Sequence, residues 1–301
     1  WQAQGTRVTQ NLLHDNVCPA GVKLFSVICV SEDIFVEVSH GPTLIDNNIM
    51  LSKAGVRLAT EGVAMVHNLI CGSFTSVGGG CDWIVEGGLR QRDTPYHIPH
   101  RTEVMGYMTI LHGDDRFYNN ISVQKYSAED EIIPHDYNDG FDVENRLVGT
   151  SVFDEYPNEE EWLKQFDFTK PADMGLLEPA HFGHLPIWTE GNAYIAGAKA
   201  YKKEINPLII DSKDVKVELV KKEDGIYLDT NVYDMIGEFE DRLVHSDILG
   251  CAFEPGQRFE NADGTAIVFD ADYFDEHRGA KIIPGPLASK DDLCKPLYKF
   301  N

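Results

Sequence analysis

One glutamate of this chain lies in a setting that suits acid–base chemistry. Glu37 stands between Val36 and Val38 in an alternating segment, and Ser39 and His40 follow it. Successive side chains of a strand point to opposite faces, so Glu37 faces away from the side that the two valines occupy. A carboxyl group on the outer face of a strand can transfer a proton to or from a bound ligand. The same pattern also fits a glutamate that only faces solvent.

A second group of polar residues lies close together further along the chain. His97, His100, Arg101 and Glu103 can hydrogen-bond a polar ligand, whereas a metal site would require them to converge on one point. Glu61 ends the strand that follows Glu37 and can bond a ligand hydroxyl or remain on the surface. We predict ligand-binding roles for His97, His100, Arg101 and Glu61.

The sequence predicts no metal and no cofactor. Asp270-Ala271-Asp272 resembles half of a calcium loop, but the remaining ligand spacing is missing. No Gly-rich loop opens a helix, and no Cys/His spacing is typical of zinc. Asp114-Asp115-Arg116 is best explained by an ion pair within a turn.

A repeated pattern indicates the elements that carry these residues. Alternating strand-like residues lead to an Asn and then to apolar residues at Asn11, Asn48, Asn68 and Asn120. Asn tolerates left-handed backbone geometry, so it suits a corner between strands. The step from Asn48 to Asn68 is 20 residues, about one coil of a β-solenoid. Such units cannot bury their apolar faces alone, so they must stack.

Two longer intervals predict loops that leave the solenoid. Asn11 and Asn48 are 37 residues apart, and Asn68 and Asn120 are 52 apart. The first insertion contains Val17–Val30, which is unusually apolar for a loop; it is either buried, an oligomer contact, or an error in the gene sequence. The second runs from Gly78 to Pro99. Loops on one face of a solenoid commonly form its binding cleft.

The residue pattern of the sequence changes after Pro207. We predict a solenoid core with loop insertions over residues 1–206 and an antiparallel, sandwich-like β region over 207–301, with strands at 215–220, 225–229 and 265–269. A short helix is predicted to begin at Glu159, and a last coil at 185–195. The chain opens on Trp1 in strand-like sequence, so we expect an N-terminal part or a second copy of the chain to cover the first coil.

Composition limits the partners. The net charge is −23, so nucleic acid is a poor partner, and no apolar run approaches the roughly 20 residues that span a bilayer. The six cysteines are too scattered for a disulfide scaffold, which favours buried free thiols and assigns no compartment.

Several segments resemble glycoside hydrolase family 120 β-xylosidases. They include Trp1–Arg7, Asp33–Pro42, Leu44–Asn48, Ala64–Leu69, Thr94–His100 and Gly113–Asn120, in fixed order. The resemblance covers most of residues 1–125 and is weaker after 185. It implies an all-β fold, a right-handed parallel β-helix, that hydrolyses β-xylosidic bonds of short xylo-oligosaccharides from one chain end.

The resemblance also implies a retaining mechanism with two carboxylates. Glu37 matches the general acid/base, and the matching nucleophile is an Asp expected directly before Trp1, outside these residues. Neighbouring parallel strands are about 4.8 Å apart, which fits the roughly 5–5.5 Å between the carboxyls of retaining enzymes. Asp15 is the alternative nucleophile within the chain. Trp1 and His40 flank the expected site, where Trp1 can stack on a sugar ring.

Two other functions remain open on the sequence alone. A polysaccharide lyase on the same architecture would want a basic groove, which the net charge opposes. A non-catalytic carbohydrate-binding β-helix needs no nucleophile. Fold by itself does not distinguish these functions.

Overall fold

The computed structural model describes residues 2–16, 32–76, 93–126, 148–166 and 183–300. It also describes the backbone of two short antiparallel pairs, β3 (Lys23–Leu24) with β4 (Val27–Ile28) and β12 (Ile84–Val85) with β13 (Gly88–Leu89). Most of the predicted insertion Val17–Val30, and Trp1 itself, lie outside the described residues.

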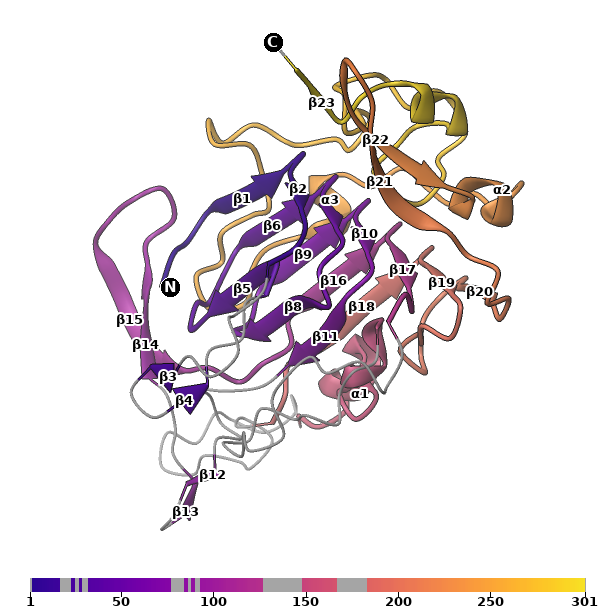
Figure 1. Cartoon of the computed structure of the whole chain (residues 1–301). Coiled ribbons are helices and arrows are strands. Elements are labelled where there is room, and N and C mark those ends of the chain that lie inside the picture. The colour runs from indigo at the N-terminus through magenta and orange to yellow at the C-terminus, as the bar shows by residue number, and fades with distance from the viewer. Residues whose placement is uncertain are drawn as a thin grey trace.

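Three parallel sheets form the body of the molecule (Figure 1). The first sheet contains β1 (Thr6–Thr9), β6 (Thr43–Asp46), β9 (Val63–Val66), β16 (Asp115–Tyr118) and β18 (Ile187–Glu190). The second sheet contains β2 (Leu12–Leu13), β7 (Ile49–Met50), β10 (Leu69–Ile70), β17 (Ile121–Val123), β19 (Ala193–Ile195) and β20 (Leu208–Ile210). The third sheet contains β5 (Ile34–Glu37), β8 (Ala54–Ala59) and β11 (Ser73–Ser76).

The strands follow a repeating path from sheet to sheet. β5, β6 and β7 give one strand to each sheet, and β8, β9 and β10 do the same one layer further on. Ile45 aligns with Met65, and Met65 with Phe117, so identical positions of successive repeats stack. The predicted parallel stacking of an all-β chain is therefore confirmed.

A ladder of asparagines holds the repeats in register. The side-chain Oδ1 of Asn48 accepts from the backbone N–H of Asn11 at 3.0 Å, and Asn68 Oδ1 accepts from Asn48 at 3.0 Å. Asn120 continues the ladder at 2.9 Å and Asn192 at 2.8 Å. Each amide of the ladder thus satisfies a backbone donor that the corner would otherwise leave unpaired.

The left-handed residue of each corner precedes the ladder asparagine. Gln10, Asn47, His67 and Asn119 have φ between 54° and 57°, whereas none of the ladder residues has a positive φ. The expectation that Asn11, Asn48, Asn68 and Asn120 take the left-handed conformation is therefore wrong, although Asn47 and Asn119, which do take it, are also asparagines. The asparagines are required for their side-chain amides, because both a donor and an acceptor are needed to continue the ladder.

The C-terminal third covers two outer faces of the parallel sheets. Ile49, Leu69 and Ile121 of the second sheet pack outward against Val217 and Tyr233. Another cluster joins the outer face of the first sheet to the segment 244–269; it contains Leu44, Ala64, Val66, Tyr118, Val244, Leu249, Phe259, Ile267 and Phe269. These strands are buried on both faces, while the inner core lies between the three sheets.

The C-terminal region contains one antiparallel sheet among its described residues. It consists of β21 (Val217–Lys221), β22 (Gly225–Thr230) and β23 (Tyr298–Lys299). β20 lies beyond the predicted boundary at residue 206 and pairs in parallel with β19. The strand predicted at 265–269 is wrong, because this segment forms only an isolated bridge between Val268 and His245.

The helices in the described residues are few and short. They are η1 (Thr150–Phe153), α1 (Glu159–Leu163), α2 (Val232–Ile236), α3 (Ser246–Leu249) and η3 (Lys290–Cys294). The helix predicted at Glu159 is confirmed, and Asn158 and Glu161 form a capping box at its start. In the described part of the chain no helix has the length and apolar character that a membrane crossing needs.

We expect Glu204 to make stability depend on pH. Its Oε1 accepts from Asn192 Nδ2 at 2.8 Å and ends the ladder, and Tyr194 donates to its other oxygen. Burial raises the pKa of Glu204 to about 7, so the folded state binds this proton more tightly than the unfolded chain. The free energy of unfolding should therefore fall as pH rises from about 4.5 to about 7, by on the order of 3 kcal/mol.

Urea unfolding at a series of pH values measures this effect. In Glu204→Gln the decrease over that range should be much smaller, with a remainder from Asp114, whose pKa burial also raises. An identical pH dependence in both proteins would show that Glu204 is not the responsible group.

Candidate active site

The corner between the third and first sheets carries both Glu37, at the end of β5, and His40. Gly41 and Gly62 have φ of +73° and +70°, and they stack directly on one another. A Cβ on Gly62 would lie 2.7 Å from the His40 carbonyl oxygen, so a side chain does not fit there. This close approach fixes the backbone on either side of the corner.

Glu37 ends β5 at this corner and is partly exposed. Val36 packs against the inner core, whereas Phe35 and Glu37 lie on the opposite face, as the alternation predicts. The backbone N–H of Gln2 donates to the Glu37 carbonyl at 3.4 Å, and Ser39 Oγ donates to the Ala3 carbonyl at 2.5 Å. The segment before β1 is thus held alongside the strand of Glu37.

His40 and Glu61 form a buried pair behind this surface. His40 Nδ1 lies 2.5 Å from Glu61 Oε1, and its Nε2 lies 3.0 Å from the Thr94 carbonyl oxygen. Burial alone would lower the pKa of His40, but the hydrogen bond and charge of Glu61 outweigh it, so the pKa of His40 is raised. The ring edge also contacts Tyr96, with centroids 5.6 Å apart.

Glu61, predicted to bind a ligand with a surface position as the alternative, lies neither on the surface nor in the lining of the pocket described below. Its side chain is fully buried, and Oε2 accepts from the Leu111 backbone N–H at 2.8 Å. Both carboxylate oxygens are thus engaged within the protein. The arrangement suits Glu61 to orienting His40, and through it the corner that carries Glu37.

Burial raises the pKa of two further carboxyl groups near this pair, Asp114 and Glu254. Burial raises the pKa of Asp114 to about 6, although its ion pair with Arg116 opposes the shift. Burial and the charge of Glu61 raise the pKa of Glu254. Groups that change protonation near neutral pH are typical of acid–base sites and also of buried ion-pair networks. The predicted pairing of Asp114 with Arg116 is confirmed at 2.7 Å.

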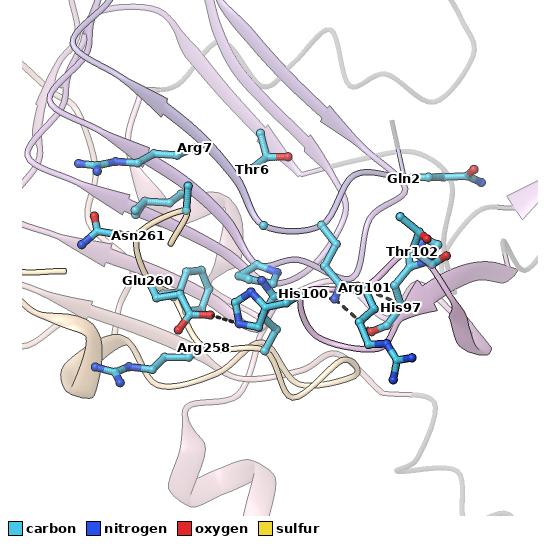
Figure 2. Close-up of a pocket in the computed structure, with 17 residues that line it drawn as sticks. Gln2, Thr6, Arg7, His97, His100, Arg101, Thr102, Arg258, Glu260 and Asn261 are labelled. Atoms are coloured by element: carbon cyan, nitrogen blue, oxygen red, sulfur yellow. Dashed lines mark hydrogen bonds and ion pairs between the residues drawn. The ribbon is translucent and has the colours of Figure 1, made fainter. Parts of the chain in front are cut away.

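A pocket of about 680 Å³ adjoins this corner (Figure 2). It lies between β1, the tip of the hairpin formed by β14 (Asp93–His97) and β15 (Val104–Thr109), and the segment 257–262. Gln2 lines it and donates to the Glu37 carbonyl, whereas the side chain of Glu37 itself is not part of the lining. Its volume lies within the range of small-molecule sites.

Polar contacts tie the three walls of the pocket together. Gln4 Nε2 donates to the His97 carbonyl at 3.1 Å and to Gln257 Oε1 at 2.7 Å. His100 Nε2 lies 2.9 Å from Glu260 Oε1, and Figure 2 shows this contact crossing between the hairpin and the C-terminal segment. Because these contacts join residues far apart in sequence, they fix the shape of the pocket.

The structure separates the predicted residues into three groups. His97, His100 and Arg101 line the pocket, while His40 and Glu61 are buried at the corner and do not line it. Asp15 is exposed and follows β2, near Asp33 at the start of the coil. Glu37 lies four residues beyond Asp33 along β5, roughly 13 Å of strand, so Asp15 is not brought beside Glu37.

Sequence reasoning missed one wall of the pocket. Gln257, Arg258, Glu260 and Asn261 come from a segment more than 200 residues from Glu37, and no local pattern links the two. Gln2 and Gln4 belong to a segment that was recognised, but not to the predicted ligand-binding set. The described residues contain no group of His, Cys, Asp or Glu side chains arranged to hold a metal ion.

Comparison with known proteins gives one structural relationship. No family model matches the chain, and no curated protein matches it. The chain is similar to XylC, whose structure was solved in complex with xylose, with 30% sequence identity and a TM-score of 0.72. The match covers 96% of this chain and 38% of XylC, so the chain spans less than half the length of that protein.

Proposed function

We propose that this chain is the core of a glycosidase that acts on xylosides, a β-xylosidase of glycoside hydrolase family 120 built on a right-handed parallel β-helix. The observation that carries the proposal is the position of Glu37. It is a partly exposed carboxyl at the end of β5, beside a pocket of about 680 Å³, in a chain similar to a xylose complex over 96% of its length. Exo-action on short xylo-oligosaccharides is part of this proposal.

In the proposed mechanism Glu37 is the general acid and then the general base. It protonates the leaving oxygen as the nucleophile attacks the anomeric carbon, and it then deprotonates the water that releases the sugar. The nucleophile is expected directly before Trp1. The hydrogen bond from Gln2 to the Glu37 carbonyl supports this expectation, because it holds the segment that begins at Gln2 beside the strand of Glu37.

His40 and Glu61 have a supporting part in the proposal. Their buried pair braces the turn that follows Glu37, with His40 Nδ1 2.5 Å from Glu61 Oε1. His97, His100 and Arg101 would contact the sugar from the hairpin side of the pocket. Stacking of Trp1 on the sugar is part of the proposal and rests on the family resemblance alone.

The stereochemistry of the first product tests the mechanism. We expect proton NMR during hydrolysis of an aryl β-xyloside to show β-xylose before mutarotation, because two displacements retain the configuration. The assay requires protein that includes the residue before Trp1. α-Xylose as the first product would exclude a retaining mechanism. Absence of hydrolysis would favour a non-catalytic carbohydrate-binding protein.

One observation favours a second candidate, a lyase acting on acidic sugars. Arg7, Arg101 and Arg258 line the pocket despite the net charge of −23, and a basic groove is what a uronate needs. Each arginine is paired with a carboxylate of the protein, to Asp46, Glu103 and Asp247, which lowers the local positive charge. A lyase would release an unsaturated uronate from a polyuronate, and ultraviolet absorbance detects that product.

A further inference from the structure

A second cavity lies at the other end of the first sheet, away from the pocket beside Glu37. It has a volume of about 360 Å³, and we call it the Trp162 pocket. It is lined by Asp114, Arg116, Glu159, Trp162, Pro186, Trp188, Ile248, Leu249, Gly250, Cys251 and Phe253. Residues 248–253 close this cavity, and residues 257–262 of the same segment close the larger pocket.

Arg116, which lines the Trp162 pocket, has its charge balanced and most of its donors occupied by groups of the protein. Arg116 pairs with Asp114 at 2.7 Å and donates to the Leu249 and Cys251 carbonyls, each at 2.9 Å. Its guanidinium also lies over the Trp188 ring, 4.4 Å from the centroid. Since Asp114 balances its charge and these acceptors use its donors, Arg116 is not arranged to bind an anion.

The walls combine aromatic rings with carboxylate acceptors. Trp162 and Phe253 meet edge to face with centroids 5.5 Å apart, and Phe253 is 48% exposed. At the rim, exposed Glu159 accepts from the Trp188 indole N–H at 3.4 Å. Pyranose sugars have apolar C–H faces that pack on aromatic rings, and hydroxyl groups that donate to carboxylates.

We infer that the Trp162 pocket binds a neutral pyranose unit of an oligosaccharide. The identification of the sugar as xylose rests on the proposed function. Two to four strand spacings separate β1 and β6, which line the larger pocket, from β16 and β18, which line the Trp162 pocket, so the two sites are roughly 10–20 Å apart across the sheet. An oligosaccharide held at the larger pocket can therefore reach the Trp162 pocket with a remote unit.

Binding by the full chain tests this inference directly. Xylotetraose is titrated into the protein carrying Glu37→Gln, which blocks turnover, while the indole N–H resonances of Trp162 and Trp188 are followed by NMR. We expect both resonances to shift, and Phe253→Ala to weaken xylotetraose binding about 3- to 10-fold, because one aromatic contact is lost. Tyr107→Ala, which removes a 66% exposed ring from β15, is the matched control and should leave binding unchanged.

The outcomes separate this site from the catalytic proposal. Phe253→Ala should not alter hydrolysis of an aryl xyloside, which is too short to reach the Trp162 pocket. Weakened xylotetraose binding without any detectable hydrolase activity would retain this site and reject the proposed reaction. Unchanged binding in Phe253→Ala, indole resonances that do not shift, or displacement of xylotetraose by tetramethylammonium, as expected for an aromatic cage for cations, would overturn the inference.

Discussion

Glu37→Gln is expected to lose about 10²- to 10⁴-fold in the hydrolysis of xylobiose. The substitution keeps the shape of the side chain but removes the proton that the sugar leaving group requires. Loss should be much smaller on aryl xylosides with acidic leaving groups, because these depart without protonation. Steady-state kinetics on the two substrates measure the difference.

Azide provides a second readout for the same variant. A small anion needs no general base to attack the glycosyl-enzyme, so azide should partly restore turnover of the aryl substrate by Glu37→Gln. Glu218→Gln, an exposed glutamate on β21, is the matched control and should behave like the parent protein. Equal and modest losses on both substrates, with no effect of azide, would mean that Glu37 is not the acid/base.

Asn68→Ala is expected to destabilise the chain by about 3–5 kcal/mol. Asn68 is fully buried, its Nδ2 donates to the Ile45 carbonyl and to Asn120 Oδ1 at 2.9 Å each, and its Oδ1 accepts from Asn48. Removing the amide leaves buried groups without partners on two neighbouring coils. Urea denaturation, followed by the far-ultraviolet circular dichroism of the strands, measures the loss.

The end of the same ladder supplies the control. Asn11 is exposed; its N and Nδ2 donate to Asn48 Oδ1 at 3.0 Å each, and Nδ2 also donates to the Thr9 carbonyl at 2.8 Å. Asn11→Ala should therefore cost about 1 kcal/mol or less, because water replaces the lost partner. Similar losses in the two variants would show that the ladder does not depend on burial for its contribution to stability.

The sequence alone determined the parallel stacking and the face of Glu37. Both follow from patterns a few residues long: the spacing of Asn48 and Asn68 fixes one repeat, and alternation around Val36 turns Glu37 away from the core. Asn192 carries the ladder beyond the four predicted corners, and Glu204 ends it. The left-handed residue was misplaced by one position, since sequence identifies the asparagine but not which backbone unit turns.

Tertiary structure alone decided what surrounds these elements. Glu61 and Gly62 look like a polar turn in sequence, yet Glu61 is buried because the repeat that follows supplies Leu111 and the corner before it supplies His40. Both pockets exist because residues 244–269 cover the outer face of the first sheet, through packing of Leu249 and Phe259. Contacts between segments 200 residues apart depend on which faces pack against each other. Short-range periodicity in the sequence does not predict that pairing.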